Sequence, residues 1–300
     1  MDRTQLRGVI PPLATPLHND GSLNLAAIAP LVEYVLAAGV HGVFATGSQG
    51  EAFALTADER RQVLDAVLDA VNGRVPVMAG TGAITTRDAV ALSRAAEAAG
   101  ADCLSVITPY FITPTQDELY AHYAEIAAAV SIPVLAYSNP GRTGGVRLAP
   151  ETQARLAAEF PNIVGVKDSS GDLSETAALI RACPPDFRVF VGRDSLLYAG
   201  LCYGAVGAVA MTANVVPELL VGVYEAFCAG DHARARALQD QVTLLREALP
   251  GIGGSYPAPV KAALELLGVP VGPPRRPIRP LNDAQRERLR AVLRQVGKDV

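Results

Sequence analysis

The sequence predicts an α/β protein of the (β/α)8 TIM-barrel type with a C-terminal helical extension. Two observations lead to this prediction: eight short apolar runs alternate with segments of helical period, and the runs are continuously apolar. Continuous runs are typical of strands in a parallel sheet, because both faces of such strands are buried. The expected strands span residues 8–13, 42–45, 75–79, 103–107, 133–137, 163–166, 188–191 and 205–210.

Helices are expected between these strands and after the last one, in segments rich in Ala, Leu and Glu with an amphipathic period. Thr56 precedes Glu59 at the spacing of a capping box, and Gly39 and Gly100 stand where helices should end. The expected barrel helices span residues 25–38, 56–71, 86–99, 116–130, 150–159, 173–182, 195–201 and 217–228. Three further helices, at 232–248, 259–267 and 283–296, follow without a strand between them.

We therefore expect a (β/α)8 catalytic barrel over residues 1–228 and a C-terminal helical segment over residues 229–300. The other architecture with alternating strands and helices is an open, doubly wound sheet. The number of strands favours the barrel. A dinucleotide-binding sheet would carry GxGxxG after an early strand, and the GTG at residues 80–82 lacks the third glycine.

The composition excludes several classes of protein. Half of the 300 residues are hydrophobic and the formal net charge is −4, with no basic run beyond Arg275 and Arg276, so nucleic-acid binding is not expected. Residues 1–12 do not resemble a signal peptide, and no apolar run is long enough to cross a bilayer. We expect no membrane association.

The cysteines and histidines indicate the compartment and the chemistry. Four widely spaced cysteines without a CxxC pair predict reduced core residues and a cytoplasmic protein. They are Cys103, Cys183, Cys202 and Cys228. The four histidines are isolated from one another, so a metal site is not expected. No P-loop is present, and no cofactor is expected either.

Lys167 directly follows the apolar strand at 163–166, at the end where barrel active sites form. A side chain at that position points into the barrel mouth, where burial favours the neutral amine. The neutral amine is the form that attacks a carbonyl group to give a Schiff base. The alternative is a structural lysine that extends from the strand end to pair with Asp168 or another acid.

Two further polar positions follow apolar strands. Tyr137 ends the preceding strand, so its phenol is expected beside Lys167, where it can move protons; alternatively, it is an ordinary tyrosine at the barrel rim. Residues 47–51 (GSQGE) follow the second strand. Their glycines can present backbone N–H groups to a carboxylate, with the Ser48 hydroxyl nearby. The same letters also fit a plain turn between a strand and a helix.

Together, these motifs resemble those of the dihydrodipicolinate synthase and N-acetylneuraminate lyase family over nearly the whole chain. The likeness begins with VIPPLATP at 9–16 and ends with PAPVK at 257–261 and the last helix. Between them lie GSQGE at 47–51, GTG at 80–82, YSNPGRTG at 137–144, GVKDSSGD at 165–172 and GRD at 192–194. The resemblance implies a class I, pyruvate-dependent lyase or aldolase without a cofactor.

The resemblance also implies roles for individual residues. Lys167 forms the imine with the 2-oxo group of pyruvate, Tyr137 moves protons, and Ser48 orients the Tyr137 hydroxyl. Backbone amides around Ser48 and Gln49 hold the pyruvate carboxylate. The other implied substrate-binding residues are Arg142, Gly192 and Val209. The implied assembly is a homotetramer built as a dimer of dimers.

Two positions depart from the pattern of the family's synthases. Synthases usually carry a second hydroxyl residue where this chain has Gln49. They also carry a second tyrosine, which reaches into a neighbouring subunit, where this chain has Phe111. The relay of three hydroxyls therefore loses a member. Arg142 argues for a synthase, since sialic acid lyases generally lack it; it can equally bind the distal carboxylate of another substrate.

The main hypothesis is a Schiff-base-forming lyase acting on pyruvate or another 2-oxo acid, with 4-hydroxy-tetrahydrodipicolinate synthase as the nearest named activity. The alternatives are an aldolase or dehydratase of a sugar-derived 2-oxo acid and a non-catalytic 2-oxo-acid sensor. Lysine-inhibited synthases carry polar residues at a tight subunit interface. The matching positions are Ala52, Ala57, Ile84 and Asp88. We therefore expect no feedback inhibition by lysine.

Overall fold

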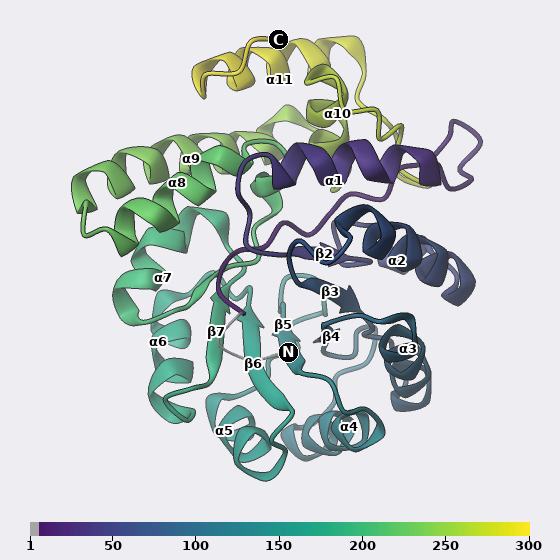
Figure 1. Cartoon of the computed structure of the whole chain (residues 1–300), viewed down its shortest axis with the longest axis vertical. Helices are drawn as coiled ribbons and strands as arrows, with labels where there is room; N and C mark the ends of the chain where they lie inside the picture. The colour runs from purple at the N-terminus through teal and green to yellow at the C-terminus, as the bar shows by residue number, and fades with distance from the viewer. Residues whose placement is uncertain (1–5) are drawn as a thin grey trace.

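The computed structural model describes residues 6–300 and contains a ring of eight parallel strands surrounded by helices (Figure 1). The hydrogen-bonded order runs from β1 through β8 and back down to β2, and a bridge between Pro12 and Phe44 joins the first strand segment to β2. The fold is therefore the predicted (β/α)8 barrel. The strands are β1 Gly8–Val9, β2 Val43–Ala45, β3 Val77–Gly80, β4 Cys103–Ile107, β5 Val134–Ser138, β6 Ile163–Asp168, β7 Arg188–Val191 and β8 Gly207–Ala208.

The barrel helices match the predicted segments closely. They are α1 Ile28–Leu36, α2 Ala57–Val71, α3 Thr86–Ala99, α4 Gln116–Ala129, α5 Pro150–Glu159, α6 Leu173–Ala182, α7 Leu197–Tyr203 and α8 Pro217–Cys228. The predicted capping box is confirmed: the Thr56 hydroxyl accepts from the Glu59 amide, and the Glu59 carboxylate accepts from the Thr56 amide. Gly100 ends α3 in a left-handed conformation, as predicted.

The first and last strands are shorter than predicted, because β1 and β8 pair over two residues each. Pro11 and Pro12 have no N–H group to donate to a ladder, which interrupts regular pairing after Val9. The strand segments still occupy their expected places in the ring. Residues 1–5, which belong to the segment predicted not to be a signal peptide, lie outside the described residues.

The interior of the barrel holds a compact apolar cluster, separate from the core between strands and helices. Its members are Leu6, Ile10, Phe44, Met78, Cys103, Leu135, Val164, Phe190 and Val209. Alternate residues of each strand point inward to this cluster or outward to the helices, as strand geometry requires. The cluster forms a packed floor, so a substrate can be bound only above it, at one end of the barrel.

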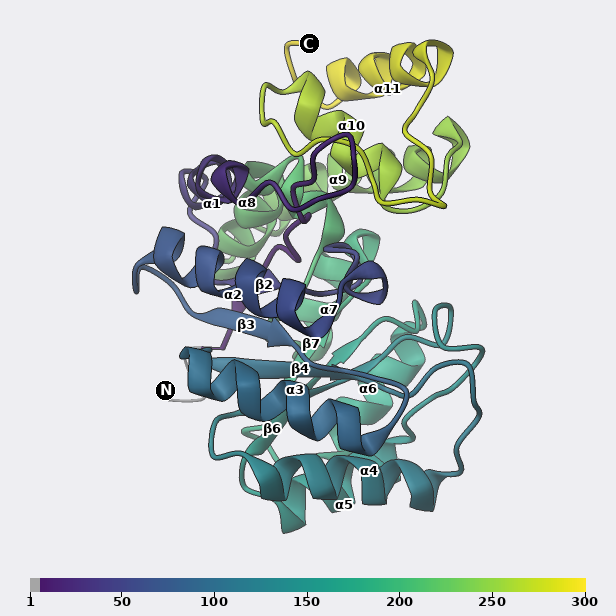
Figure 2. The ribbon, with the colours of Figure 1, turned by 90° about the vertical axis from the view of Figure 1, so that its right-hand side faces the viewer.

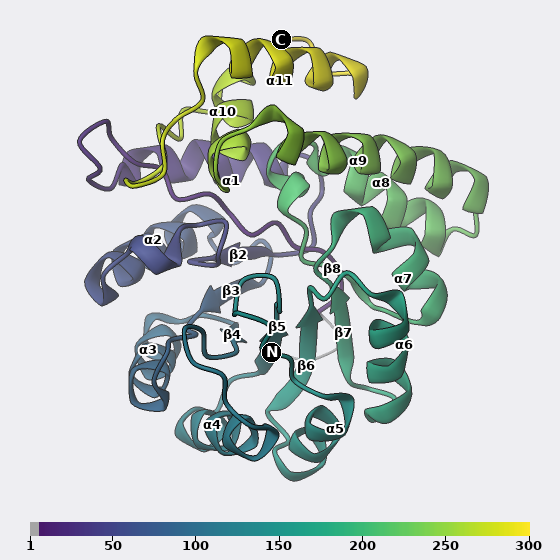
Figure 3. The ribbon, with the colours of Figure 1, turned by 180° about the vertical axis from the view of Figure 1, so that it is seen from behind.

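Three helices follow the barrel: α9 His232–Ile252, α10 Ala258–Leu266 and α11 Asp283–Gln295. The first continues through Pro250 to Ile252, so the prediction that it ends at residue 248 was wrong. A proline near the end of a helix removes a single hydrogen bond, which the last turn tolerates. In Figures 2 and 3, α10 and α11 lie beyond α1 at one side of the barrel. The domain boundary after residue 228 stays a prediction.

The cysteines are only partly core residues. Cys103 and Cys183 are buried as predicted, whereas Cys202 and Cys228 are exposed, and all four thiols are free. The prediction was wrong for the exposed pair because these side chains lie on α7 and at the end of α8, away from the strands. Within residues 6–300, no helix is both long and apolar enough to cross a membrane.

Candidate active site

The structure brings Lys167 and Tyr137 together at the carboxyl ends of β6 and β5, where they are register partners. The Lys167 amine nitrogen lies 4.1 Å from the centre of the Tyr137 ring and 5.2 Å from the centre of the Phe44 ring. Lys167 is only 4% exposed. The amine and the phenol therefore lie next to each other, as predicted, and both side chains are buried.

Asp168 is not the partner of Lys167, although it follows directly in the sequence. Its carboxylate accepts from the Ser170 amide at 2.9 Å and from the Thr176 hydroxyl at 2.5 Å. Among residues 6–300, the lysines that form ion pairs are Lys261 and Lys298. The alternative of a structural lysine paired with an acid is therefore not what the structure shows.

The Tyr137 hydroxyl is the centre of a small hydrogen-bond network. The Asn139 amide nitrogen donates to it at 2.7 Å, and Ser48 and Ser169 bond to it through their side chains. Burial by itself raises the pKa of Tyr137, but the charge of Lys167 and these hydrogen bonds outweigh burial and leave the pKa below its usual value. A phenol in this setting releases its proton more readily than an ordinary tyrosine.

Residues 47–51 form a tight turn beside this pair. Within the described part of the chain, the amides of Ser48, Gln49 and Gly50 donate to no acceptor. Thr46 and Glu51, on either side of the turn, both have left-handed backbones, with φ of 55° and 58°. Non-glycine residues adopt this conformation only when their surroundings hold it. The turn therefore has the character of an anion-binding nest.

Three other residues predicted to bind substrate are Gln49, Gly192 and Val209. Gln49 is 1% exposed, and neither atom of its side-chain amide has a partner within residues 6–300. The Gly192 amide donates to the Asp168 carbonyl oxygen at 2.6 Å. A methyl group on Gly192 would come within 1.9 Å of the Ser169 hydroxyl and 3.0 Å of the Asp168 carbonyl oxygen, so a larger residue there would force Ser169 to move. Val209 belongs to the interior cluster of the barrel.

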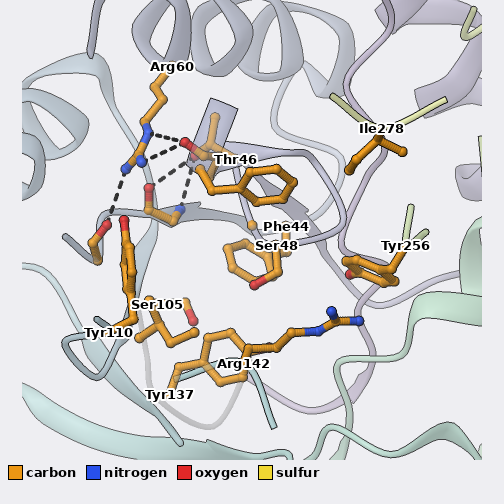
Figure 4. A pocket seen from close by; sticks show the side chains of 16 residues that line it. Phe44, Thr46, Ser48, Arg60, Ser105, Tyr110, Tyr137, Arg142, Tyr256 and Ile278 are labelled. Carbon is orange, nitrogen blue, oxygen red and sulfur yellow. Dashed lines mark hydrogen bonds between the residues drawn. The ribbon is translucent and has the colours of Figure 1, made fainter. Parts of the chain in front are cut away.

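A cavity of about 340 Å³ lies over the strand ends (Figure 4). Three predicted site residues line it, namely Ser48, Tyr137 and Arg142. Lys167 is not part of its wall, but lies close to the rings of Tyr137 and Phe44, which are. The amine therefore lies close to the cavity wall, next to two of its aromatic rings.

Sequence reasoning missed several residues of the cavity wall. Arg60 on α2 donates to the carbonyl oxygens of Ala52 and Gly82, and it lies on the same side of the cavity as Tyr110 (Figure 4). On the other side, the Arg142 guanidinium stacks 4.2 Å from the centre of the Tyr256 ring. Burial raises the pKa of Tyr256 well above its usual value. Tyr256 lies in a Pro/Gly-rich connection, where no sequence pattern marks a site.

The donor groups for a metal ion are not gathered anywhere in the described part. Within residues 6–300, no group of three or more His, Cys, Asp or Glu side chains is placed to hold an ion. The expectation that the chemistry uses neither a metal nor a cofactor rests on the sequence and stays a prediction.

A (β/α)8 barrel with a cavity over its strand ends, walled in part by a tyrosine next to a buried lysine, defines a barrel enzyme. The chain belongs to the dihydrodipicolinate synthetase family, whose model matches residues 5–296. The family resemblance inferred from the motifs is thereby confirmed. The chain is a lyase-family enzyme similar to dihydrodipicolinate synthases.

Named relatives align with the chain almost from end to end. It is 44% identical over 294 residues to a 4-hydroxy-tetrahydrodipicolinate synthase of Methanopyrus kandleri, covering 98% of this chain and 97% of the relative. It is 45% identical to an uncharacterized DapA-like lyase of Halobacterium salinarum, covering 99% and 96%. The dihydrodipicolinate synthase of Acinetobacter baumannii, solved with pyruvate, superposes with a TM-score of 0.92 at 38% identity, covering 97% and 99%.

Proposed function

We propose that the protein is a class I lyase that binds pyruvate as an imine on Lys167 and joins it to an aldehyde, or releases it in the reverse reaction. The observation that carries the proposal is the buried amine of Lys167 beside the phenol of Tyr137, where no acid of residues 6–300 forms an ion pair with it. The similar enzyme of Acinetobacter baumannii was solved with pyruvate, which supports pyruvate as the first substrate.

The proposed chemistry begins with attack of the neutral Lys167 amine on C2 of pyruvate. The ketone oxygen leaves as water after it has gained two protons, and an imine remains. Tyr137 supplies and retrieves these protons, with Ser48 orienting its hydroxyl. Loss of a methyl proton converts the imine into an enamine, whose carbon attacks the aldehyde. Hydrolysis of the new imine then releases the product and Lys167.

Substrate binding uses the groups around this centre. The free amides of Ser48 and Gln49 bind the pyruvate carboxylate, as in other anion nests. Backbone groups of Gly192 and Val209 contact the substrate near the imine. Arg142, on the far side of the cavity, binds a carboxylate of the second substrate, since its planar guanidinium matches that group.

Three observations bear on the second substrate. The identity to the Methanopyrus kandleri synthase supports aspartate semialdehyde as the aldehyde. Phe111 favours the alternative, a sugar-derived 2-oxo acid, because it is 94% exposed and has no hydroxyl for a proton relay. Gln49 favours it as well, since its buried amide has hydrogen-bonding capacity that nothing in residues 6–300 uses. Arg142 fits either substrate.

The first experiment traps the imine. The protein is incubated with pyruvate and borohydride, and the adduct is located by mass spectrometry. We expect a single reduced pyruvate adduct on Lys167, and an unmodified Lys167 would overturn the proposal. The second substrate is then identified by comparing condensation with aspartate semialdehyde against cleavage of a panel of 4-hydroxy-2-oxo acids.

A second measurement separates an enzyme from a sensor of 2-oxo acids. An enzyme that forms the enamine exchanges the methyl protons of pyruvate with solvent, so deuterium enters the methyl group in heavy water. We expect exchange at a rate that depends on Lys167. Binding of pyruvate without exchange would instead favour the sensor.

We also propose a homotetramer, built as a dimer of dimers, in the cytoplasm. Phe53, which lines the cavity, is 54% exposed, and Phe111, which follows the cavity residue Tyr110 in the chain, is 94% exposed; a second copy of the chain would cover these apolar side chains. Four free cysteines fit a reducing compartment. Native mass spectrometry tests the assembly, and a monomer at micromolar concentration would contradict it.

A further inference from the structure

A second buried lysine, Lys261 on α10, lies behind the turn at 47–51 and has no part in the chemistry proposed above. Its amine donates to Glu51 Oε1 at 2.9 Å and to the carbonyl oxygens of Thr15 at 2.9 Å and Pro273 at 2.7 Å. These acceptors use all three of its N–H bonds, and the side chain is 1% exposed. The Lys261 amine therefore has a structural role and is not available to a substrate.

Its partner Glu51 is the last residue of the turn, and its backbone is left-handed, with φ of 58°. The carboxylate is completely buried, and its second oxygen accepts from the Arg275 amide at 2.7 Å. A residue with a Cβ atom is strained in this conformation and stays there only when other contacts hold it. Both of the contacts that hold this carboxylate come from the C-terminal segment, through Lys261 and Arg275.

The backbone angles of Glu51 affect the groups that face the substrate. The Glu51 amide donates to the Ser48 carbonyl oxygen at 3.1 Å, which closes the turn. The free amides of Gln49 and Gly50 lie within this closed loop, and the Ser48 amide lies within the wider loop closed by the Ala52 amide, which donates to the Gly47 carbonyl oxygen at 3.2 Å. If Glu51 relaxed to a right-handed or extended backbone, the chain would leave the turn in another direction, the wider loop closed by Ala52 and Gly47 would open, and the turn that carries these amides would have to shift.

We propose that the Lys261–Glu51 ion pair is a positioning device for substrate capture: it holds Glu51 left-handed and thereby aims the amides of Ser48 and Gln49 at the substrate carboxylate. This inference rests on the proposed function, because it presumes that the turn binds pyruvate. It makes Lys261 and Glu51 positioning residues, and it makes the C-terminal segment a support of the active site.

The matched variants Glu51→Gly and Glu51→Ala isolate the backbone conformation. Both lose the carboxylate and leave Lys261 without its ion pair, but only glycine adopts a positive φ without steric cost. We expect the KM for pyruvate to stay within about threefold of wild type in the glycine variant and to rise about tenfold or more in the alanine variant, since small misplacements of binding groups have effects of this size. Thermal unfolding and circular dichroism establish the folded fraction of each.

Equal KM values for the glycine and alanine variants, whether raised or unchanged, would overturn the inference. A merely structural ion pair would lower the melting temperature of both variants and leave both KM values alone. Borohydride trapping at saturating pyruvate is run in parallel. A wild-type protein that traps no pyruvate refutes the proposed function, whereas normal trapping with equal KM values refutes only the positioning role.

Removal of the lysine gives an independent test. Lys261→Met should raise the KM for pyruvate in the wild-type background but not in the Glu51→Gly background, where the turn no longer needs to be held. Lys298→Met is the matched control, because Lys298 lies in the same C-terminal segment and also pairs with an acid of the barrel, Glu218 on α8, at 2.8 Å. We expect no change in its KM. A rise of equal size in both backgrounds would contradict the inference, and if Lys261→Met does not fold, the glycine–alanine comparison still decides.

Discussion

Lys167 and Tyr137 are register partners on β6 and β5, and the amine of the lysine lies over the face of the phenol ring, 4.1 Å from its centre. The negative face of an aromatic ring attracts a cation, so the ring helps to hold the amine in place. The phenol oxygen is bonded meanwhile to Asn139 and Ser48. The amine contacts the face of the ring, whereas the hydrogen bonds of Tyr137 are made by its oxygen. The amine is therefore free to attack a carbonyl carbon.

Replacing Lys167 by methionine is expected to abolish imine formation. The variant should trap no pyruvate with borohydride and should lose turnover by at least about a thousandfold, as is usual when a covalent nucleophile is removed. Methionine keeps most of the volume, so the melting temperature should not fall. Trapping on another lysine with retained turnover would show that the imine forms elsewhere.

After the charge of Lys167, the Asn139 amide contributes most to the lowered pKa of Tyr137. It donates to the phenol oxygen at 2.7 Å, and such a donor favours the phenolate, which contributes to the lowered pKa of Tyr137. Asn139→Ala should therefore raise that pKa. Wherever the reaction requires the ionised phenol, the rising limb of the rate–pH profile should move to higher pH.

The profile of kcat against pH measures this shift. Thr115→Ala serves as a control, because Thr115 caps α4 and should change stability without moving the profile. A profile of unchanged position in Asn139→Ala, with a lower plateau, would mean that Asn139 only supports the loop.

Much of the fold was predictable because a barrel repeats one local pattern. Continuous apolar runs located all eight strands. Barrel active sites form at the carboxyl ends of the strands, and this carboxyl-end rule then identified Lys167 and Tyr137. What failed were the ends of elements: Pro250 did not stop α9, because one missing hydrogen bond in a last turn has little effect. The local sequence does not show that the packing of surrounding residues compensates for the missing hydrogen bond.

The other residues of the site could not be predicted from the sequence, and the reason is different. Arg60 reaches the cavity from the first turn of an ordinary amphipathic helix, and Tyr256 reaches it from a connection far along the chain. Neither position follows a strand, so the carboxyl-end rule does not apply. The pairing of Glu51 with Lys261 is likewise a contact across more than two hundred residues. Such contacts depend on tertiary packing, which a single sequence does not reveal.

Lysine is expected to leave the enzyme uninhibited. The positions that match the inhibitor site of lysine-regulated synthases include Ala52, Ala57 and Ile84, whose side chains offer no hydrogen bond. Ile84 is 38% exposed and adds apolar surface there. Initial rates and melting temperatures should be the same with and without lysine at millimolar concentration. A dose-dependent loss of rate would show that other residues bind it.

A last prediction concerns stability at acid pH. The Glu59 carboxylate accepts from both terminal nitrogens of Arg275, at 2.7 and 2.8 Å, and this pairing lowers its pKa from 4.5 to about 2. A lowered native pKa stabilises the fold above the pKa of the unfolded glutamate, and the contribution disappears as the pH falls through the native value. Glu59→Gln keeps a cap acceptor for Thr56 but removes the charge.

At pH 7 we expect Glu59→Gln to lower the free energy of unfolding by on the order of 1 kcal/mol, since water screens a partly exposed pair. The difference from wild type should shrink between about pH 5 and pH 2, because protonation then removes the charge from wild type as well. Thermal unfolding over that range measures it. Glu287→Gln is the control, since its pair with Arg290 is exposed and should give no comparable difference. A Glu59→Gln difference that stays constant down to pH 2 would show that the hydrogen-bonding geometry of this side chain, and not its charge, stabilises the link between α2 and the C-terminal segment.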